Sequence, residues 1–164
     1  ADVYENHTSP KFTSESKTVN VDRLSTYGLH KYLSECIVRN SKKNYIILRC
    51  PMILGTNLKK GPIYDILHNS PLFVSEKSAF QMITAWELAK IIHFLLARNI
   101  KKEVFNVGGK GAVPLNKINE FIKQSITFRK NGKTHIYEMA VAKLGKIYKL
   151  KKSSEYLQDF VKEI

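Results

Sequence analysis

The chain has 164 residues, a length that suits one domain with a hydrophobic core. Its hydrophobic fraction of 43% and charged fraction of 25% are ordinary for a soluble globular protein. No segment approaches the roughly 18 consecutive apolar residues of a membrane span, which excludes such a span within this sequence.

The net charge of +13 comes from 27 basic and 14 acidic residues and indicates an anionic partner. Nucleic acid, an anionic membrane surface and a phosphorylated ligand remain open, as does a surface of solvated lysines with no partner. Most of the basic residues are lysines, which suit diffuse surface charge better than specific contacts to bases. We therefore expect no specific nucleic-acid partner.

The N-terminal third begins with a possible strand end at residues 1–4 and continues as a polar loop over 5–23. A loop of this length is usually functional or disordered. The next segment, 24–40, has helical periodicity, with one apolar stripe formed by Leu29, Leu33, Cys36 and Ile37. A short β-type run at 45–50 ends at Pro51.

The middle of the chain alternates between loops, short extended pieces and helices. Residues 52–61 are predicted to be a loop, and Pro62 suits the first turn of a helix that ends near residue 69. Short extended pieces are expected at 71–74 and 80–83. Thr84 and Glu87 form a capping-box pattern that begins a helix running to about residue 98.

The last third begins with a strand at 103–107, followed by a helix at 115–125 and a short strand at 134–137. Two basic helices are predicted at about 138–150 and 153–164. Because strands and helices alternate throughout, the expected fold is α/β with a largely parallel sheet.

Tyr27 and Lys31 lie one turn apart on the predicted 24–40 helix, so their side chains share a face. An ammonium beside a phenol favours the phenolate, which makes Tyr27 a candidate general acid/base with Lys31 as its electrostatic partner. The spacing also fits an incidental pair, because the chain has 8 tyrosines and many lysines. Tyr148 and Lys152 repeat it.

Four stretches in order resemble the extended short-chain dehydrogenase/reductase family, the NAD-dependent epimerases, dehydratases and reductases of nucleotide sugars. The resemblance spans about residues 1–125. The four stretches are Ala1-Asp-Val-Tyr4, Tyr27-Gly-Leu-His-Lys31 with Glu35, Leu48-Arg-Cys-Pro-Met-Ile-Leu-Gly55, and Phe80-Gln-Met-Ile-Thr-Ala-Trp-Glu-Leu-Ala89 with Val104-Phe-Asn-Val-Gly108.

The resemblance implies part of a Rossmann-like parallel sheet plus a small α/β substrate-binding region, with the N-terminal cofactor half missing. It divides the chain into three regions. Residues 1–50 would be a remnant of the dinucleotide-binding domain, 51–128 a mixed substrate-binding region with the last sheet strands, and 129–164 basic C-terminal helices. A homodimer through the 24–40 helix is a further expectation.

The resemblance also implies roles for individual residues. Tyr27 would move a proton on or off a sugar hydroxyl, and Lys31 would hold the nicotinamide ribose of NAD or NADP. The cofactor would also contact Cys50, Pro51 and Met52. The nucleotide-diphosphate sugar would be bound by Asn57, Lys59, Lys60, Phe80 and Gln81. No metal site is expected.

The departures from the family pattern leave alternatives open. The glycine-rich turn that seats a pyrophosphate on a helix N-terminus is not found in this sequence. The chain is therefore read as the C-terminal portion of an epimerase or 4-keto reductase, inactive by itself. A non-catalytic sugar-nucleotide-binding relative, or a basic protein that binds nucleic acid or membrane surfaces, remains possible. A 4,6-dehydratase is disfavoured because only Asp2, and no second carboxylate, precedes Val3-Tyr4.

The two cysteines, Cys36 and Cys50, both fall at predicted apolar positions, on the helix face and at the strand end. They are therefore expected to be small buried hydrophobes in a reducing compartment, the cytoplasm. No signal peptide is recognised, and the sequence begins at Ala1 rather than Met, which leaves an upstream segment open.

Overall fold

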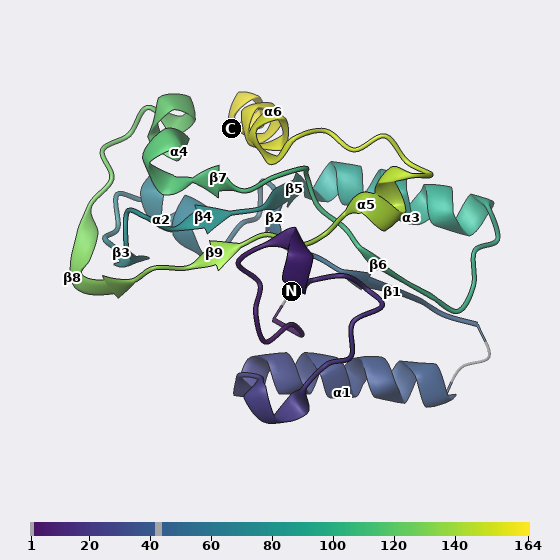
Figure 1. Cartoon of the computed structure of the whole chain (residues 1–164). Coiled ribbons are helices and arrows are strands. Elements are labelled where there is room, and N and C mark those ends of the chain that lie inside the picture. Colours follow the sequence, from purple (N-terminus) through teal and green to yellow (C-terminus); the bar gives the residue numbers. More distant parts are fainter. Residues whose placement is uncertain (1, 42–43) are drawn as a thin grey trace.

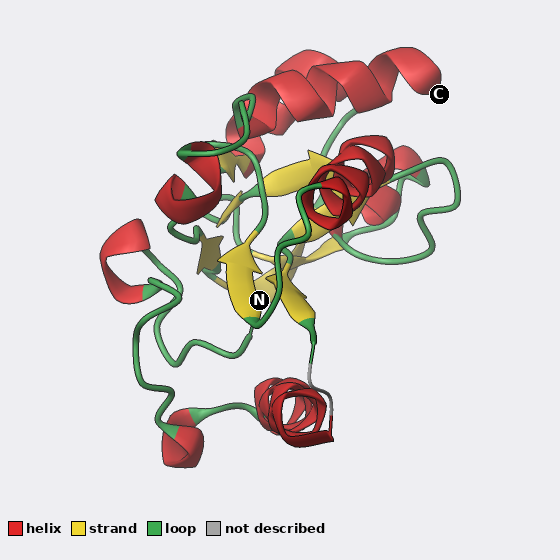
Figure 2. Cartoon of the chain, turned by 90° about the vertical axis from the view of Figure 1, so that its right-hand side faces the viewer, coloured by secondary structure: helices red, strands yellow, loops and turns green. Residues whose placement is uncertain are grey.

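The computed structural model describes residues 2–41 and 44–164. Short strands form a central layer, and in both views α1 lies on one side of it with α6 on the opposite side (Figures 1 and 2). The helices are α1 (Thr26–Ser41), α2 (Pro62–Leu67), α3 (Ala85–Ala97), α4 (Leu115–Ile122), α5 (Ala142–Gly145) and α6 (Ser153–Glu163). The loop before α1 contains the 3₁₀ turns η1 (Pro10–Phe12) and η2 (Val21–Arg23).

The strands pair mostly in parallel, which confirms the predicted α/β class. Three parallel pairs join β1 (Ile46–Arg49) to β6 (Glu103–Asn106), β2 (Met52–Leu54) to β5 (Met82–Thr84), and β3 (Leu72–Val74) to β8 (Phe128–Lys133). The strand β4 (Ala79–Phe80) lies between β9 (Ile136–Tyr137), which is parallel to it, and β7 (Val113–Pro114), which is antiparallel.

Two buried clusters form most of the core, and α6 contributes to both. Leu157 and Phe160 pack with α2, α4 and the strands β2 to β5, while Tyr156 packs with α3 and β6. Apolar burial of this kind is the main stabilising contribution to such a fold. Because α6 packs in both clusters, the C-terminal helix connects strands β2 to β5 with the β1–β6 pair.

Local signals correctly located the starts of α2 and α3. The Thr84 hydroxyl accepts a hydrogen bond from the Glu87 amide (3.2 Å) and so begins α3, as predicted. Pro62 begins α2. The predicted helix 115–125 ends earlier, at Ile122, because Lys123 adopts a left-handed conformation (φ 56°) that stops α4.

Several strand predictions need correction. Residues 2–4 form turns rather than a strand end, and Ala1 lies outside the described residues. The predicted loop 52–61 begins with β2, and the single extended piece at 80–83 is divided between β4 and β5. The strand β8 was missed because its sequence, Phe-Arg-Lys-Asn-Gly-Lys, is polar and its residues are almost all exposed.

The predicted helix at 138–150 is wrong except for the short helix α5. Its first backbone amides are recruited by distant partners: Glu138 donates to the His7 carbonyl, Met139 to the Gln81 side chain and Ala140 to the Thr13 hydroxyl. Tertiary hydrogen bonds therefore keep residues 138–140 out of a helix despite the helical periodicity of the sequence. The second predicted basic helix is confirmed as α6.

The apolar stripe predicted for the 24–40 helix does not face the core of the described structure. Leu33 is 48% exposed and Ile37 65% exposed, and both cysteines are only partly buried free thiols. None of the helices within the described ranges is long and apolar enough to cross a bilayer.

Candidate functional site

A cleft of about 640 Å³ opens between α1 and the ends of the central strands. It brings together eight of the ten residues predicted from the sequence: Tyr27, Lys31, Cys50, Pro51, Met52, Lys60, Phe80 and Gln81. These residues come from α1, the β1–β2 junction, the loop before α2 and the β4–β5 junction. A site assembled from chain segments so far apart is produced by the fold and not by sequence proximity.

One wall of the cleft is the face of α1 that carries Tyr27, Lys31 and Glu35. The Lys31 ammonium lies 5.3 Å from the centroid of the Tyr27 ring, and the Tyr27 side chain is 58% exposed. The cation and the phenol are therefore neighbours at a solvent-accessible surface, a geometry suited to proton exchange with a bound hydroxyl.

The wall opposite α1 includes the β1–β2 junction, where Cys50 and Pro51 separate the two strands. Burial raises the pKa of the Cys50 thiol to about 11, so this cysteine is a neutral, weakly reactive group near pH 7. Pro51 and Met52 add an apolar surface. This part of the cleft therefore offers an apolar surface on which a flat ring could pack, and its thiol is a poor nucleophile.

The floor of the cleft is formed by Phe80 and Gln81. Phe80 is 7% exposed and stacks on Tyr137 with ring centroids 5.9 Å apart. The Gln81 amide donates to the carbonyls of Gly109 (2.8 Å) and Met139 (3.1 Å), and its oxygen accepts from the Met139 amide (3.0 Å). Gln81 thus shapes the floor by holding the backbone of Gly109 and Met139 in place, and both polar atoms of its side chain already form hydrogen bonds.

The predicted diphosphate contacts separate in the structure. Lys60 lines the cleft beside Gly61, which has a positive φ of 100° and precedes α2. Asn57 and Lys59 are exposed in the same loop and lie outside the cleft lining. The cleft therefore contains one lysine from this loop and a second, Lys31, from α1.

Asp2 and Tyr137 are among the cleft residues to which the sequence analysis gave no site role. Burial, together with the charge of Asp2 and a hydrogen bond to it, raises the pKa of Tyr137 to about 12. The strand β9 has only two residues, both partly buried, so it shows no alternation, and its pairing with β4 is a tertiary fact.

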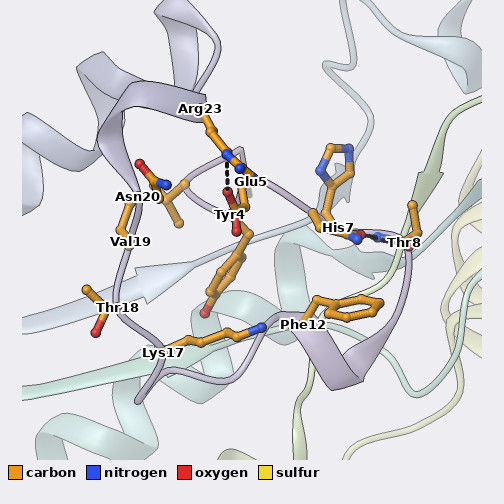
Figure 3. Close-up of a pocket in the computed structure, with 12 residues that line it drawn as sticks. Tyr4, Glu5, His7, Thr8, Phe12, Lys17, Thr18, Val19, Asn20 and Arg23 are labelled. Carbon is orange, nitrogen blue, oxygen red and sulfur yellow. Dashed lines mark hydrogen bonds and ion pairs between the residues drawn. The ribbon is translucent and has the colours of Figure 1, made fainter.

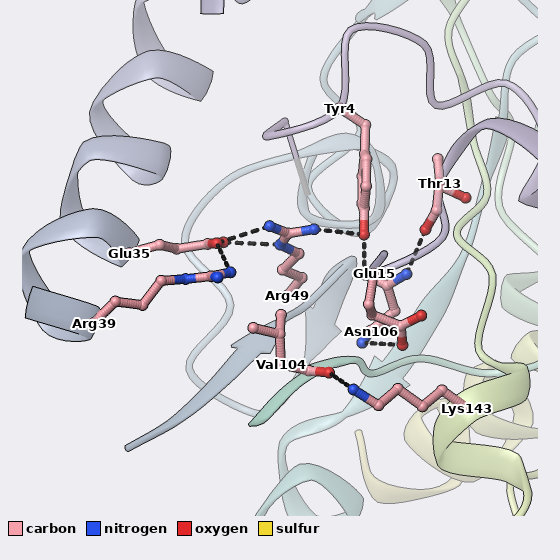
Figure 4. A network of polar contacts seen from close by, with 9 residues as sticks. All are labelled: Tyr4, Thr13, Glu15, Glu35, Arg39, Arg49, Val104, Asn106 and Lys143. Atoms are coloured by element: carbon pink, nitrogen blue, oxygen red, sulfur yellow. Dashed lines mark hydrogen bonds and ion pairs between the residues drawn. The ribbon is translucent and has the colours of Figure 1, made fainter. Parts of the chain in front are cut away.

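A buried polar network that begins at the cleft residues Glu35 and Arg49 connects α1 to the strands (Figure 4). Arg49 donates to both carboxylate oxygens of Glu35 (2.9 and 2.8 Å) and to the Tyr4 hydroxyl (2.8 Å). The Tyr4 hydroxyl donates to Asn106 (2.8 Å), whose side chain donates to the carbonyls of Thr13 and Ala140. Burial raises the pKa of Tyr4 even though Arg49 opposes this, so Tyr4 stays a neutral donor.

A second cavity of about 640 Å³ lies inside the N-terminal loop (Figure 3). Its lining includes the exposed pair Arg23–Glu5 (3.8 Å), Lys17, whose ammonium lies 5.1 Å from the Phe12 ring centroid, and His7. His7 stacks on Tyr137 at 3.9 Å, and burial lowers its pKa. This stack joins the loop cavity to the wall of the main cleft.

Gly109, which follows β6, has a packing role. A Cβ atom at Gly109 would lie 2.5 Å from the Ser153 amide nitrogen, so this glycine allows the β6 end to pack against the start of α6. Within residues 2–41 and 44–164, no three His, Cys, Asp or Glu side chains come together to hold a metal ion.

Comparisons by sequence find no matching protein-family model and no matching curated protein. Comparison by structure finds the fold in many solved structures. Three are a dTDP-glucose 4,6-dehydratase from Bacillus anthracis in complex with NAD, a UDP-galactose 4-epimerase, and a mutant UDP-glucuronic acid 4-epimerase from Bacillus cereus in complex with NAD and a fluorinated UDP-sugar.

The TM-scores are 0.72, 0.69 and 0.69, with sequence identities of 15%, 18% and 18%. The matches cover 98%, 100% and 99% of this chain but only 58%, 62% and 59% of those structures. This chain therefore has the fold of a portion of NAD-dependent nucleotide-sugar epimerases and dehydratases and spans about three fifths of their length. The resemblance seen in the four sequence stretches is confirmed at the level of the fold.

Proposed function

We propose that this chain is the C-terminal portion of an NAD(P)-dependent nucleotide-sugar epimerase or 4-keto reductase. The observation that carries the proposal is the single cleft that gathers Tyr27, Lys31 and the β1–β2 junction with Lys60 and the Phe80 floor. These groups belong to separate sequence motifs. Their convergence supports a common site.

In this proposal Tyr27 is the general acid/base for a sugar hydroxyl, and Lys31 assists it electrostatically and holds the nicotinamide ribose. The pair fits this task because the ammonium and the ring are adjacent and open to the cleft. Cys50, Pro51 and Met52 supply an apolar wall for the nicotinamide ring. When bound, NAD or NADP would supply the hydride chemistry. No metal is assigned a role.

The nucleotide-diphosphate sugar would enter from the side of Lys60, whose charge suits a phosphate. Phe80 and Gln81 would close the pocket, with Gln81 acting through shape because its amide is hydrogen-bonded to backbone. Asn57 and Lys59 remain proposed contacts for the outer part of the ligand, since they extend from the same exposed loop.

Epimerisation or reduction at one carbon is preferred to 4,6-dehydration. Elimination of water needs one group to take a proton and another to give it. Asp2 is the carboxylate at the corresponding end of the cleft, and it is already hydrogen-bonded to Tyr137. The fold does not separate these reactions, because a dehydratase and epimerases both share it.

We also propose a homodimer through α1. Leu33 and Ile37 form an exposed apolar pair on this helix, which supports such an interface.

Two alternative functions remain. A non-catalytic nucleotide-sugar-binding protein would use the same cleft without turnover. A basic protein that binds polyanions is supported by the net charge of +13 and predicts binding that falls steeply with salt.

The test compares Tyr27→Phe with the wild-type full-length protein, using UDP- and dTDP-hexoses with NAD. Loss of an acid/base typically lowers kcat by about 10²–10⁴-fold while cofactor affinity changes little. Wild-type-like turnover in Tyr27→Phe would reject the assignment of the base. Nucleotide-sugar binding without any turnover in the wild type would support the non-catalytic alternative.

The isolated 164-residue chain gives a second test. Calorimetry is expected to show neither tight NAD binding nor turnover, because no glycine-rich pyrophosphate turn is present in this sequence. Micromolar NAD affinity for the isolated chain would contradict the proposal that another portion of the protein supplies that site.

A further inference from the structure

The helix that carries Tyr27 and Lys31 contacts the rest of the molecule mainly through a glycine and a charged side chain. Within α1, all of which the structure describes, the buried residues are Gly28 and Glu35, neither of which is an apolar side chain. Leu33 and Ile37 face outward. Tyr32, which is partly buried, packs against Val3, Tyr4 and Met139. Apolar packing is non-directional, so this contact restricts the rotation of α1 about its own axis less than directional hydrogen bonds do.

The first anchor is the ion pair between Glu35 and Arg49, whose side chains are 9% and 3% exposed. Two parallel hydrogen bonds of 2.9 and 2.8 Å fix the guanidinium in the plane of the carboxylate, a geometry that a lysine cannot reproduce. Arg39 also approaches Glu35, at 3.6 Å, but its side chain is 39% exposed.

The second anchor is the contact between Gly28 and the backbone of Asp2. A Cβ atom at position 28 would lie 2.1 Å from the Asp2 carbonyl oxygen, so only glycine allows this approach. The Ser25 hydroxyl accepts a hydrogen bond from the Gly28 amide (3.1 Å) and fixes the same turn. Gly28 therefore holds the N-terminal end of α1 as Arg49 holds its middle.

We propose that Arg49 and Gly28 are positioning residues that set the rotation of α1 and so direct Tyr27 and Lys31 into the cleft. Tyr27, Lys31 and Glu35 follow one another at intervals of four residues and share one helix face. Fixing Glu35 to Arg49, at the end of β1, consequently turns the whole face toward the β1–β2 junction. The catalytic meaning of this orientation rests on the proposed function, but the orientation itself does not.

A buried ion pair is weak evidence for stability, because the desolvation of both charges offsets much of their attraction. Its directional hydrogen bonds do restrict geometry. A role in positioning accordingly predicts that small changes to Arg49 alter the placement of Tyr27 in a protein that is still folded.

The experiment compares Arg49→Lys with the matched control Arg39→Lys in the isolated chain. Both variants keep the positive charge, and both replace an arginine that approaches Glu35. The readout is the NMR signal of the Tyr27 ring, assigned by its absence in Tyr27→Phe, together with the nuclear Overhauser contacts between Tyr27 and Lys31. Arg49→Lys should shift the ring signals and weaken these contacts, and Arg39→Lys should leave both as in the wild type.

Unchanged Tyr27 signals in folded Arg49→Lys would overturn the proposal, as would equal changes in both variants. If Arg49→Lys does not fold, Glu35→Gln keeps the side-chain shape, removes the ion pair and is read in the same way. Gly28→Ala tests the second anchor with the same signals. Because no turnover is measured, a negative result here is distinct from failure of the Tyr27→Phe kinetic test.

Discussion

Helices α1 and α6 lie on opposite sides of the strand layer and are held by different forces (Figure 1). Helix α6 buries Tyr156, Leu157 and Phe160 in the two core clusters. Helix α1 is held by the contact of Gly28 with the turn at residues 2–4, by the partly buried ring of Tyr32 and by the buried Glu35–Arg49 ion pair to β1. One helix is therefore fixed mainly by apolar area and the other mainly by directional polar contacts.

The difference separates stability from placement. Apolar burial stabilises α6 in proportion to the area it covers and tolerates small rotations. The bidentate Arg49–Glu35 pair adds less net stability but defines one geometry. The helix that carries the candidate acid/base is the one that is positioned by geometry.

The largest effect is expected from Arg49→Met, which leaves the Glu35 carboxylate buried without its partner. Breaking a buried pair in this way typically costs about 3–5 kcal/mol of unfolding free energy. Chemical denaturation measures it, with Arg39→Met as the control on the exposed side of the same carboxylate. A loss below about 1 kcal/mol would show that water enters and solvates Glu35.

The next effect concerns the apolar anchor. Leu157→Ala removes a fully buried side chain from α6 and should cost about 2–5 kcal/mol. Ile37→Ala on α1, where the side chain is 65% exposed, should change stability by less than about 0.5 kcal/mol. Similar losses in the two variants would mean that α1 is also packed against apolar surface, for example in a homodimer.

A smaller effect is expected from the ion pair at α6. The Lys151 ammonium lies 2.7 Å from the Asp159 carboxylate, but the two side chains are 49% and 39% exposed. Asp159→Asn should therefore cost no more than about 1 kcal/mol, and less at high salt. A loss comparable to that of Arg49→Met would remove the distinction between the exposed and buried pairs.

The smallest expected effect is a pH dependence in the loop that leads to α1. Burial lowers the pKa of His7 below its ordinary value of about 6.5, so the unfolded chain binds this proton more readily than the folded chain. The contribution of His7 to the free energy of unfolding is therefore present above about pH 6.5 and is lost as the pH falls through the lowered pKa of the folded state. His7→Phe keeps a ring stacked on Tyr137 and should flatten the decline in stability between pH 7 and roughly 5.5.

The matched control is His68→Phe, which replaces an exposed imidazole stacked on Tyr64 (3.9 Å). Denaturation curves at the two pH values are compared for the wild type and both variants. A decline in His7→Phe as steep as in the wild type would assign the acid sensitivity to other groups.

The candidate site was predictable wherever a short motif fixed both residue type and element. Tyr27 and Lys31 share a face because of helix periodicity alone, and Cys50–Met52 follow β1 because Pro51 ends the strand. Asp2 and Tyr137 could not be predicted, because they reach the cleft through the β4–β9 pairing and the turn at residues 2–4.

The sequence by itself determined the alternation of strands and helices, the helix starts at Thr84 and Pro62, and the residues of the proposed catalytic pair. Only the tertiary structure decided which face of α1 is buried. Periodicity indicated the stripe of Leu33 and Ile37, yet the helix docks through Gly28 and Glu35. Hydrophobic patterning reports which residues avoid water, whereas hydrogen bonds between distant segments depend on where the fold places their partners.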